Sequence, residues 1–147
     1  RPPRSTQSRS SAASDVYKRQ ELEVRLPTEA EWVEAAGGEE GDRFAWGKLK
    51  DPEKEIVRYA NTAESKIGRT TPVWMYPQGA SPRGVRELSG NVWEWQANYF
   101  DKDLGFLSLR GGSWNSHWDY ARVAARNHDH PYAHWDNFGF RLVAHPL

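Results

Sequence analysis

Four of the five histidines of the chain fall between residues 113 and 142, in the stretch SWNSHWDYARVAARNHDHPYAHWDNFGFRL. Histidine, aspartate and serine side chains can ligate metals, move protons or contact a bound ligand. His117, His128, His130 and His134 are therefore candidate ligands of a transition metal, and the HDH triplet would place two imidazoles on one side of an extended chain. Their spacing matches no strong metal motif, which favours another use of these side chains.

The same stretch has an unusual composition. Between Asn115 and Asn137, 13 of 23 residues are Asn, Ser, His, Asp or Tyr, interleaved with the unvarying-looking segment ARVAAR and with Pro131. Single changes of the adenines in an Asn codon, AAC or AAT, produce Tyr, His, Asp and Ser codons. This mixture is the pattern expected from adenine-directed mutagenesis by a diversity-generating retroelement. Trp118 and Trp135 do not arise in this way, so they are either fixed or derived from other codons.

These residue types also suit ligand binding. Tyr and Trp give large rigid contact areas, while Asn, Ser, Asp and His adapt their hydrogen bonds to a partner. The alternative is that polar loops are in general rich in Asn and Asp. The candidate ligand-binding residues are Ser116, His117, Trp118, Asp119, Tyr120, His128, Asp129, His130, Tyr132, His134, Trp135 and Asp136.

A binding surface must bring its variable positions together. We therefore expect these positions, apart from the two tryptophans, to lie on one exposed face. We expect the intervening ARVAAR to be buried as a spacer. Trp114, Arg126 and Phe140 are expected in the core, where their replacement would unfold the domain.

One helix is expected at LPTEAEWVEAAGG. Thr28 and Glu31 form a capping box, in which each side chain accepts a hydrogen bond from the backbone amide of the other residue. Gly37 is expected to end the helix. Ala30, Val33 and Trp32 are the expected buried face. Beyond Gly38, Gly, Pro, Asp and Asn separate short runs such as PVWMYP, NVWEWQANYF, LSLRGGSW and FGFRLVA. This pattern predicts a few short strands and much ordered loop, fixed by buried aromatic residues.

The first twenty residues are interpreted separately. SSAASDVYKRQ looks like a translated sequencing adaptor, of the kind fused to metagenomic reading frames, and the alternative is a disordered basic tail. Residues 21–147 are then the expected domain. They carry 15 basic and 19 acidic residues, a net charge of −4. No basic footprint for nucleic acid is present, and no apolar run is long enough to cross a bilayer.

Seven short motifs carry a family resemblance. RLPTEAEW, FAWG, YANT, GRTTPV, LSGNVWEW, LRGGSW and FGFRLV occur in the order found in the formylglycine-generating enzyme family, also called sulfatase-modifying factors. The resemblance spans about Val24 to Val143. It implies an α+β, C-type-lectin-like fold of the formylglycine-generating subtype, with little regular secondary structure. It also implies an N-terminally truncated domain, because family members carry a strand and a helix before RLPTEAEW.

The family's oxidase chemistry is not expected here. The enzyme proper holds copper with two cysteines, which would fall at Ser116 and between Asp119 and Ala121. The sequence contains no cysteine at all. Ser and Asp are poor ligands for Cu(I), which selects soft sulfur. We therefore expect no copper, no disulfide and no thiolate nucleophile in this chain.

Calcium is the metal that the resemblance implies. A first site would use Glu87, the carbonyls of Gly90 and Val92, and the side chain of Glu94. A second would use Asn61, Thr62, Ser65 and Ile67. Oxygen ligands on irregular loops suit Ca²⁺. Glu87 replaces the usual Asn or Asp, and Ser65 replaces a charged ligand; the alternative is that Glu94 only anchors its loop.

The favoured interpretation is a non-catalytic binding domain with a diversified surface at 115–137, of bacterial or phage origin, whose partner is a protein or a glycan. One alternative is a non-diversified regulatory or structural module of the same family. Another is a fragment of a formylglycine-generating enzyme or of an iron-dependent sulfoxide synthase of the ergothioneine pathway. The sequence does not distinguish a cell-surface, secreted or phage-particle location.

Overall fold

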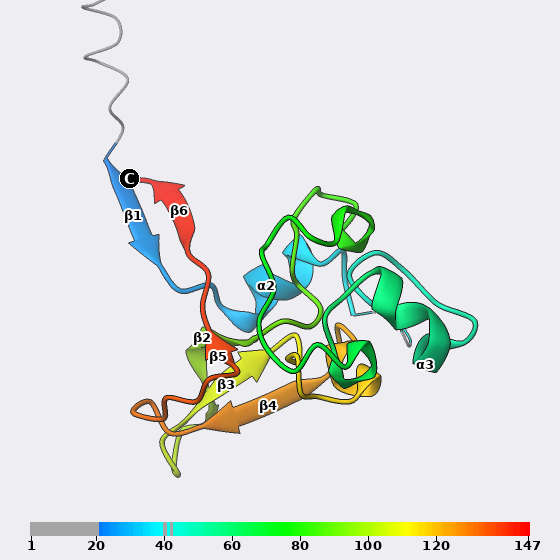
Figure 1. The fold of residues 1–147 in the computed structure, drawn as a ribbon. Helices are drawn as coiled ribbons and strands as arrows, with labels where there is room; N and C mark the ends of the chain where they lie inside the picture. Colours follow the sequence, from blue (N-terminus) through cyan, green and yellow to red (C-terminus); the bar gives the residue numbers. More distant parts are fainter. Residues whose placement is uncertain (1–20, 40, 42) are drawn as a thin grey trace, which may run out of the picture.

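The computed structural model of the chain describes residues 21–39, 41 and 43–147. The adaptor-like segment 1–20 lies outside the described residues. A four-stranded sheet in the order β4-β3-β2-β5 lies at the centre, and a separate two-stranded sheet pairs β1 with β6 at one end of the molecule (Figure 1). The strands are β1 (Leu22–Arg25), β2 (Trp93–Asp101), β3 (Phe106–Arg110), β4 (Arg126–Asp129), β5 (Phe138–Gly139) and β6 (Val143–Pro146).

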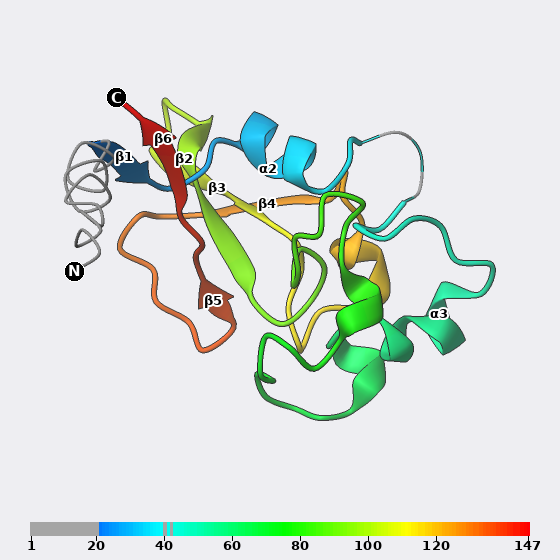
Figure 2. The same ribbon diagram turned by 90° about the horizontal axis from the view of Figure 1, so that it is seen from above.

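The helices are short. They comprise α2 (Glu29–Ala35), α3 (Pro52–Glu55) and four 3₁₀ turns at Ile56–Arg58, Ala63–Ser65, Pro77–Gly79 and Trp118–Ala121 (η4). Seen from above, α2 runs along one side of the sheet, while the long irregular segment with α3 lies beyond its end (Figure 2). None of the helices in the described part of the chain is long and apolar enough to cross a membrane.

The predicted runs became strands in three of four cases. NVWEWQANYF contains all of β2 except its last residue, LSLRGGSW contains most of β3, and FGFRLVA contains β5 and the start of β6. The prediction is wrong for PVWMYP, which forms turns because its two prolines cannot donate to a strand ladder. Strand β4 lies within the polar stretch 115–137, and it is held by antiparallel pairing with β3 rather than by apolar periodicity.

Helix α2 begins and ends as its sequence predicts. The Thr28 hydroxyl accepts from the Glu31 amide at 3.3 Å, and the Thr28 amide donates to the Glu31 carboxylate at 2.8 Å. Gly37, at φ 89°, follows the helix in the left-handed conformation. Its buried face is Trp32 with Ala36, one turn apart. Ala30 is exposed, contrary to expectation, because a residue two positions from Trp32 points to the opposite side of the helix.

Two apolar clusters form the core. Trp32 and Ala36 pack with Ala45, Leu88 and Val123 in the first, and the second joins Phe44, Ile56, Ala60 and Ala121. Trp46 is stacked between Phe44 and Tyr59, with ring centroids 5.1 and 5.0 Å away. Loops with little secondary structure are thus fixed by aromatic packing.

The expectations for the buried spacer and for three core residues need correction. In ARVAAR, Ala121 and Val123 are buried, but Ala124 and Arg126 are exposed, because alternate residues point away from the core. Trp114 is half-buried. Phe140 is 65% exposed and lies at a surface hollow rather than in the core. Arg126 lies at the surface, where it forms an ion pair with Glu29.

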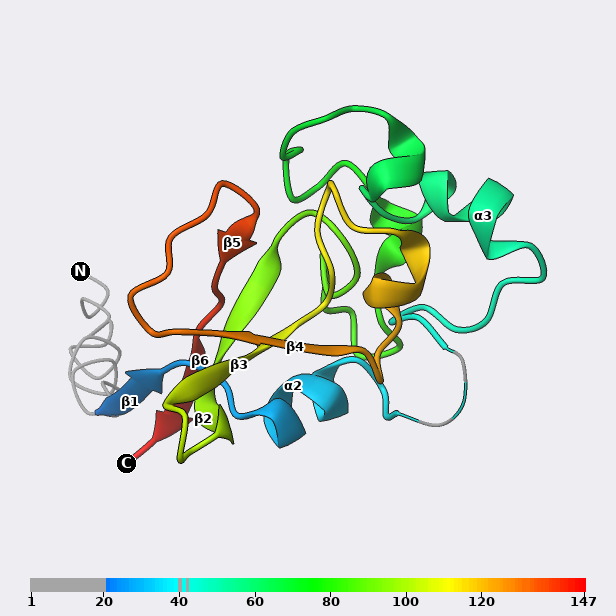
Figure 3. The same cartoon turned by 90° about the horizontal axis from the view of Figure 1, so that it is seen from below.

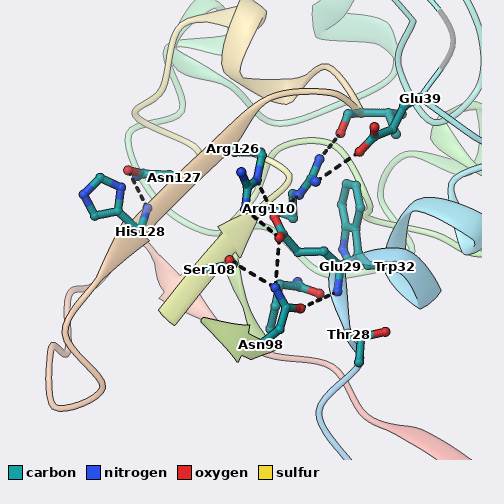
Figure 4. Close-up of polar contacts among 12 residues, drawn as sticks. Thr28, Glu29, Trp32, Glu39, Asn98, Ser108, Arg110, Arg126, Asn127 and His128 are labelled. Atoms are coloured by element: carbon teal, nitrogen blue, oxygen red, sulfur yellow. Dashed lines mark hydrogen bonds and ion pairs between the residues drawn. The ribbon is translucent and has the colours of Figure 1, made fainter. Parts of the chain in front are cut away.

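Glu29, the first residue of α2, anchors the helix to three strands (Figure 4). Its carboxylate accepts from Arg110 of β3 at 2.7 Å, from Arg126 of β4 at 2.8 Å and from Asn98 of β2 at 2.9 Å. Arg110 is almost fully buried, and its other nitrogens donate to the Val123 carbonyl and to Glu39. Burial alone would disfavour the charged carboxylate, but the hydrogen bonds from Arg126, Asn98 and Arg110 outweigh it and lower the pKa of Glu29 to about 2.

Candidate ligand-binding surface

The first part of the stretch 115–137 lines a surface hollow of about 310 Å³. Trp93, from β2, forms its buried wall, and Tyr120, at the end of η4, is half exposed. The two rings meet edge to face, with centroids 6.1 Å apart. The other lining residues are Asn115, Ser116, His117 and Asn127. Beside the hollow, the Asn137 side-chain amide donates to Asn115 at 2.9 Å and so links two segments that are 22 residues apart.

Strand β4 divides the remaining candidates between two faces of the sheet. Arg126 and His128 both contact the ring of Phe100, so they share the face that carries α2. Asn127 lines the hollow with Trp93 on the opposite face. Alternate residues of a strand point to opposite faces, which places Asp129 with Asn127. The Trp135 indole, 3.2 Å from Asp129, lies beside that carboxylate.

On the face with α2, imidazole and aromatic rings form a continuous stack. His128 lies between Phe100 and Phe106, with centroids 4.3 and 4.8 Å away. His130 contacts Phe106 at 4.5 Å and stacks on Tyr132 at 5.0 Å. The two histidines of HDH therefore do share one side of an extended segment. Their neighbours are rings, and no group of three or more His, Cys, Asp or Glu that could hold a metal occurs in the described part of the chain.

The expectation of one common face is therefore wrong. None of the ten positions is fully buried, but η4 and the loop 130–137 lie at opposite ends of β4 (Figure 3), and β4 points His128 and Asn127 in opposite directions. Trp118 also differs from expectation, since it is half-buried against the cluster around Phe44. The positions on the face of the hollow are Ser116, His117, Tyr120, Asp129 and Trp135, and those exposed in the loop 130–137 include His134 and Asp136.

Three asparagines complete the hollow face. Asn115, Asn127 and Asn137 fall inside the predicted variable stretch but were not among the predicted contact residues. Their identity was a usable signal, because the codon argument above starts from Asn, from which single adenine changes give Tyr, His, Asp and Ser codons.

The loop proposed for the first calcium site holds two acidic residues in different environments. The Glu94 carboxylate is buried and accepts from Arg141 at 2.6 Å through two nitrogens and from the Trp32 indole at 2.8 Å. Both carboxylate oxygens of Glu87 are buried without a hydrogen-bond partner among residues 21–39, 41 and 43–147. Burial raises the pKa of Glu87 to about 7, although Arg141 opposes the shift. Glu87, Glu94 and Arg141 line a second surface hollow, of about 380 Å³, which is distinct from the hollow beside Trp93.

The hydrogen-bond partners of Glu87 and Glu94 determine which of the two carboxylates can ligate a cation. The unpartnered Glu87 oxygens fit a hard cation such as Ca²⁺, together with the carbonyls of Gly90 and Val92. Glu94 does not fit as a ligand, because its charge is already neutralised by Arg141. It instead joins α2, β2 and the segment after β5.

The residues proposed for the second calcium site bond to one another. The Asn61 side-chain oxygen accepts from the Ser65 hydroxyl at 2.9 Å, and its nitrogen donates to the Arg69 carbonyl at 2.8 Å. Thr62 is buried, and the Ile67 amide donates to Ser65. This set contains no carboxylate. It would therefore hold Ca²⁺ more weakly than a site with charged ligands, although the buried Thr62 hydroxyl has no hydrogen-bond partner among the described residues, and this second site stays a prediction.

Comparison with known proteins identifies the family. Residues 6–146 match the profile of the sulfatase-modifying factor enzyme 1-like domain, and the match begins within the segment interpreted as adaptor-like. The chain belongs to this family, that of the formylglycine-generating enzymes. Its structure has the α+β, C-type-lectin-like fold of that family, with few helices.

Among curated relatives, the formylglycine-generating enzyme of Streptomyces coelicolor is 37% identical over 147 residues, covering 81% of this chain and 46% of the relative. The hercynine oxygenase of Mycobacterium tuberculosis is 34% identical over 141 residues, covering 82% and 32%. Among solved structures, Treponema denticola variable protein 1 aligns with a TM-score of 0.71 and 28% identity, covering 81% of this chain and 46% of that one. The chain thus spans less than half of each of these proteins.

Proposed function

We propose that this domain is a non-catalytic ligand-binding domain, and that it is the variable protein of a diversity-generating retroelement. The observation that carries the proposal is the likeness to Treponema denticola variable protein 1, combined with the Asn, Ser, His, Asp and Tyr residues concentrated at 115–137. The contact surface is assigned to the hollow face, because Ser116, His117 and Tyr120 line one hollow together with Asn115 and Asn127. Asp129 lies on the same face of β4, where its carboxylate contacts the Trp135 indole.

The relatives named as enzymes support a different candidate function, a fragment of an enzyme of the same family. Hercynine oxygenase and formylglycine-generating enzyme share the domain, but the chain covers only 32% and 46% of their lengths. The thiolate copper site of the family cannot be built from this chain, because it contains no cysteine. A non-diversified module of the same family is the remaining alternative.

The diversified interpretation has a direct genomic test. A complete locus should contain a reverse transcriptase gene and a template repeat that differs from codons 115–137 only at adenines. A complete locus without either would overturn the diversified interpretation, while leaving a non-diversified binding module possible.

A protein-level prediction follows from the same assignment. Replacing His117, Tyr120 and Trp135 together by residues of the Asn, Ser, His, Asp and Tyr set should change which ligands are bound. The free energy of unfolding should change little, because exposed substitutions cost within about 0.5 kcal/mol each. Selection from a displayed ligand library measures the first effect and urea denaturation the second. Loss of folding in this variant would show that these positions are structural, which would contradict the proposal.

We also propose that Ca²⁺ binds at Glu87. A ligand that binds only the folded state raises its stability by mass action, so adding Ca²⁺ should raise the melting temperature and chelation should lower it. Glu87→Gln should abolish the response, whereas Glu53→Gln, an exposed change on α3, should retain it. Melting curves that are identical with calcium and with chelator would remove this site.

A further inference from the structure

We infer that the hollow between β2, η4 and β4 binds a neutral polyhydroxylated ring, such as one sugar residue of a glycan. The inference rests on the proposed binding function and names its ligand class. It depends on which polar groups of the hollow are already used within the protein, on the charge around it, and on one exposed aromatic ring.

The asparagine side chains of the hollow are oriented by internal hydrogen bonds. The Asn115 oxygen accepts from the Ser113 hydroxyl at 2.7 Å and from the Asn137 amide at 2.9 Å. The Asn127 oxygen accepts from the backbone amide of His128 at 2.9 Å. The side-chain nitrogens of Asn115 and Asn127 donate to none of the described residues. The hollow therefore offers N–H donors and selects a ligand that is rich in oxygen acceptors.

His117 adds a group of the opposite kind. Its Nδ1 lies 2.7 Å from Asp119 Oδ1, and a carboxylate can only accept, so Nδ1 carries the hydrogen. In the neutral imidazole, Nε2 is then an acceptor. The Tyr120 hydroxyl, without a hydrogen bond to the described residues, can donate or accept. A ligand hydroxyl satisfies both kinds of group, because it also donates and accepts.

The hollow disfavours ionic ligands of either sign, anions because of its charge and cations because of its hydrogen-bond donors. The carboxylates of Asp119 and Glu64 flank His117, at 2.7 and 3.7 Å from its two ring nitrogens. One Glu64 oxygen is buried without a hydrogen-bond partner in the part of the chain described. This negative potential opposes a carboxylate or phosphate ligand. An ammonium or guanidinium ligand would bring only donors to the donor nitrogens of Asn115 and Asn127. A neutral polyol is not repelled by the carboxylates, and its hydroxyl oxygens can accept from the asparagine nitrogens.

Tyr120 supplies a flat apolar surface beside these polar groups. Its side chain is 50% exposed, and the edge-to-face contact with the buried Trp93 fixes the plane of its ring. A rigid tyrosine gives contact area at a low entropy cost. The apolar face of a pyranose can lie on this ring while its hydroxyls reach Asn115, Asn127 and His117.

The test is binding of the purified chain to an array of neutral glycans, followed by titration of the best soluble oligosaccharide from that array. Asn127→Asp keeps the oxygen that accepts from His128 but removes the donor nitrogen, so we expect a loss of affinity of about fivefold or more. Tyr120→Ala should cost a similar factor. Hexalysine and hexaglutamate peptides serve as probes for the two ionic classes.

Two control variants match these changes at other sites. Gln78→Glu adds the same charge at an exposed position of the Pro77–Gly79 turn, and Trp74→Ala removes an exposed ring outside the stretch 115–137. Neither should alter oligosaccharide binding. Absence of any neutral glycan bound, or binding that is unchanged by both Asn127→Asp and Tyr120→Ala, would overturn the inference. Binding of a protein or ionic ligand on the same face would overturn it too, yet would leave the proposed function intact.

Discussion

Replacing Glu29 with glutamine should lower the free energy of unfolding by about 2 kcal/mol at neutral pH. The change leaves the buried Arg110 without a charged partner on α2 and weakens the link between that helix and β2, β3 and β4. Removing one partner of a buried pair costs about 3 to 5 kcal/mol, and the partial exposure of Arg126 reduces that figure through solvent screening. Urea denaturation of the two proteins at pH 7 measures the difference.

The effect of Glu29→Gln should depend on pH. The Glu29 carboxyl has an ordinary pKa of 4.5 when unfolded and a pKa of about 2 in the folded protein. Its stabilisation is therefore fully present above pH 4.5 and is lost as the pH falls towards 2. The stability difference between wild type and variant should shrink across that interval. A difference that stays constant from pH 7 to pH 2.5 would show that the glutamate acts through packing alone. Glu53→Gln is the control, because Glu53 is exposed on α3.

Trp32→Ala should be the more damaging change, lowering the free energy of unfolding by about 4 kcal/mol. Trp32 is only 1% exposed, packs with Leu88 and Val123, and donates its indole hydrogen to Glu94 at 2.8 Å. Its truncation opens a cavity beneath the sheet and removes one of the three hydrogen bonds to a buried carboxylate. Thermal and urea unfolding should both show the loss.

The matched control for Trp32 is Trp74→Ala. Trp74 is 70% exposed, so its removal should change the free energy of unfolding by no more than about 0.5 kcal/mol. Equal losses for the two tryptophans would contradict the packing described for α2. Trp32→Phe should fall between the two, because it keeps one six-membered ring in the core while removing the donor to Glu94 and the rest of the indole.

Local structure was largely predictable where it depends on neighbouring residues. Thr28 and Glu31 are three positions apart, so their capping box and the start of α2 follow from sequence alone. The left-handed Gly37 likewise marks the end of the helix. The ordered motifs indicated the family and its fold before any coordinates, because seven motifs in one order are specific even where secondary structure is sparse.

The exposure of a side chain and the face to which it points depended on contacts between segments that are distant in sequence. Phe140 reads as a core aromatic, but its place at a surface hollow is set by how the chain after β5 meets Arg86 and Glu87. Glu94 reads as a metal ligand, but Arg141, 47 residues later, occupies both of its oxygens.

The sequence by itself determined the family, the capped helix, the absence of cysteine chemistry and the polar stretch 115–137. Only the tertiary structure decided which of those polar residues act together. Pairing of β4 with β3 sends His128 to the face of α2 and Asn127 to the hollow, two neighbours in sequence with opposite surroundings. The physical reason is that side chains alternate along a strand, so residue type alone cannot assign a face until the strand and its register are known.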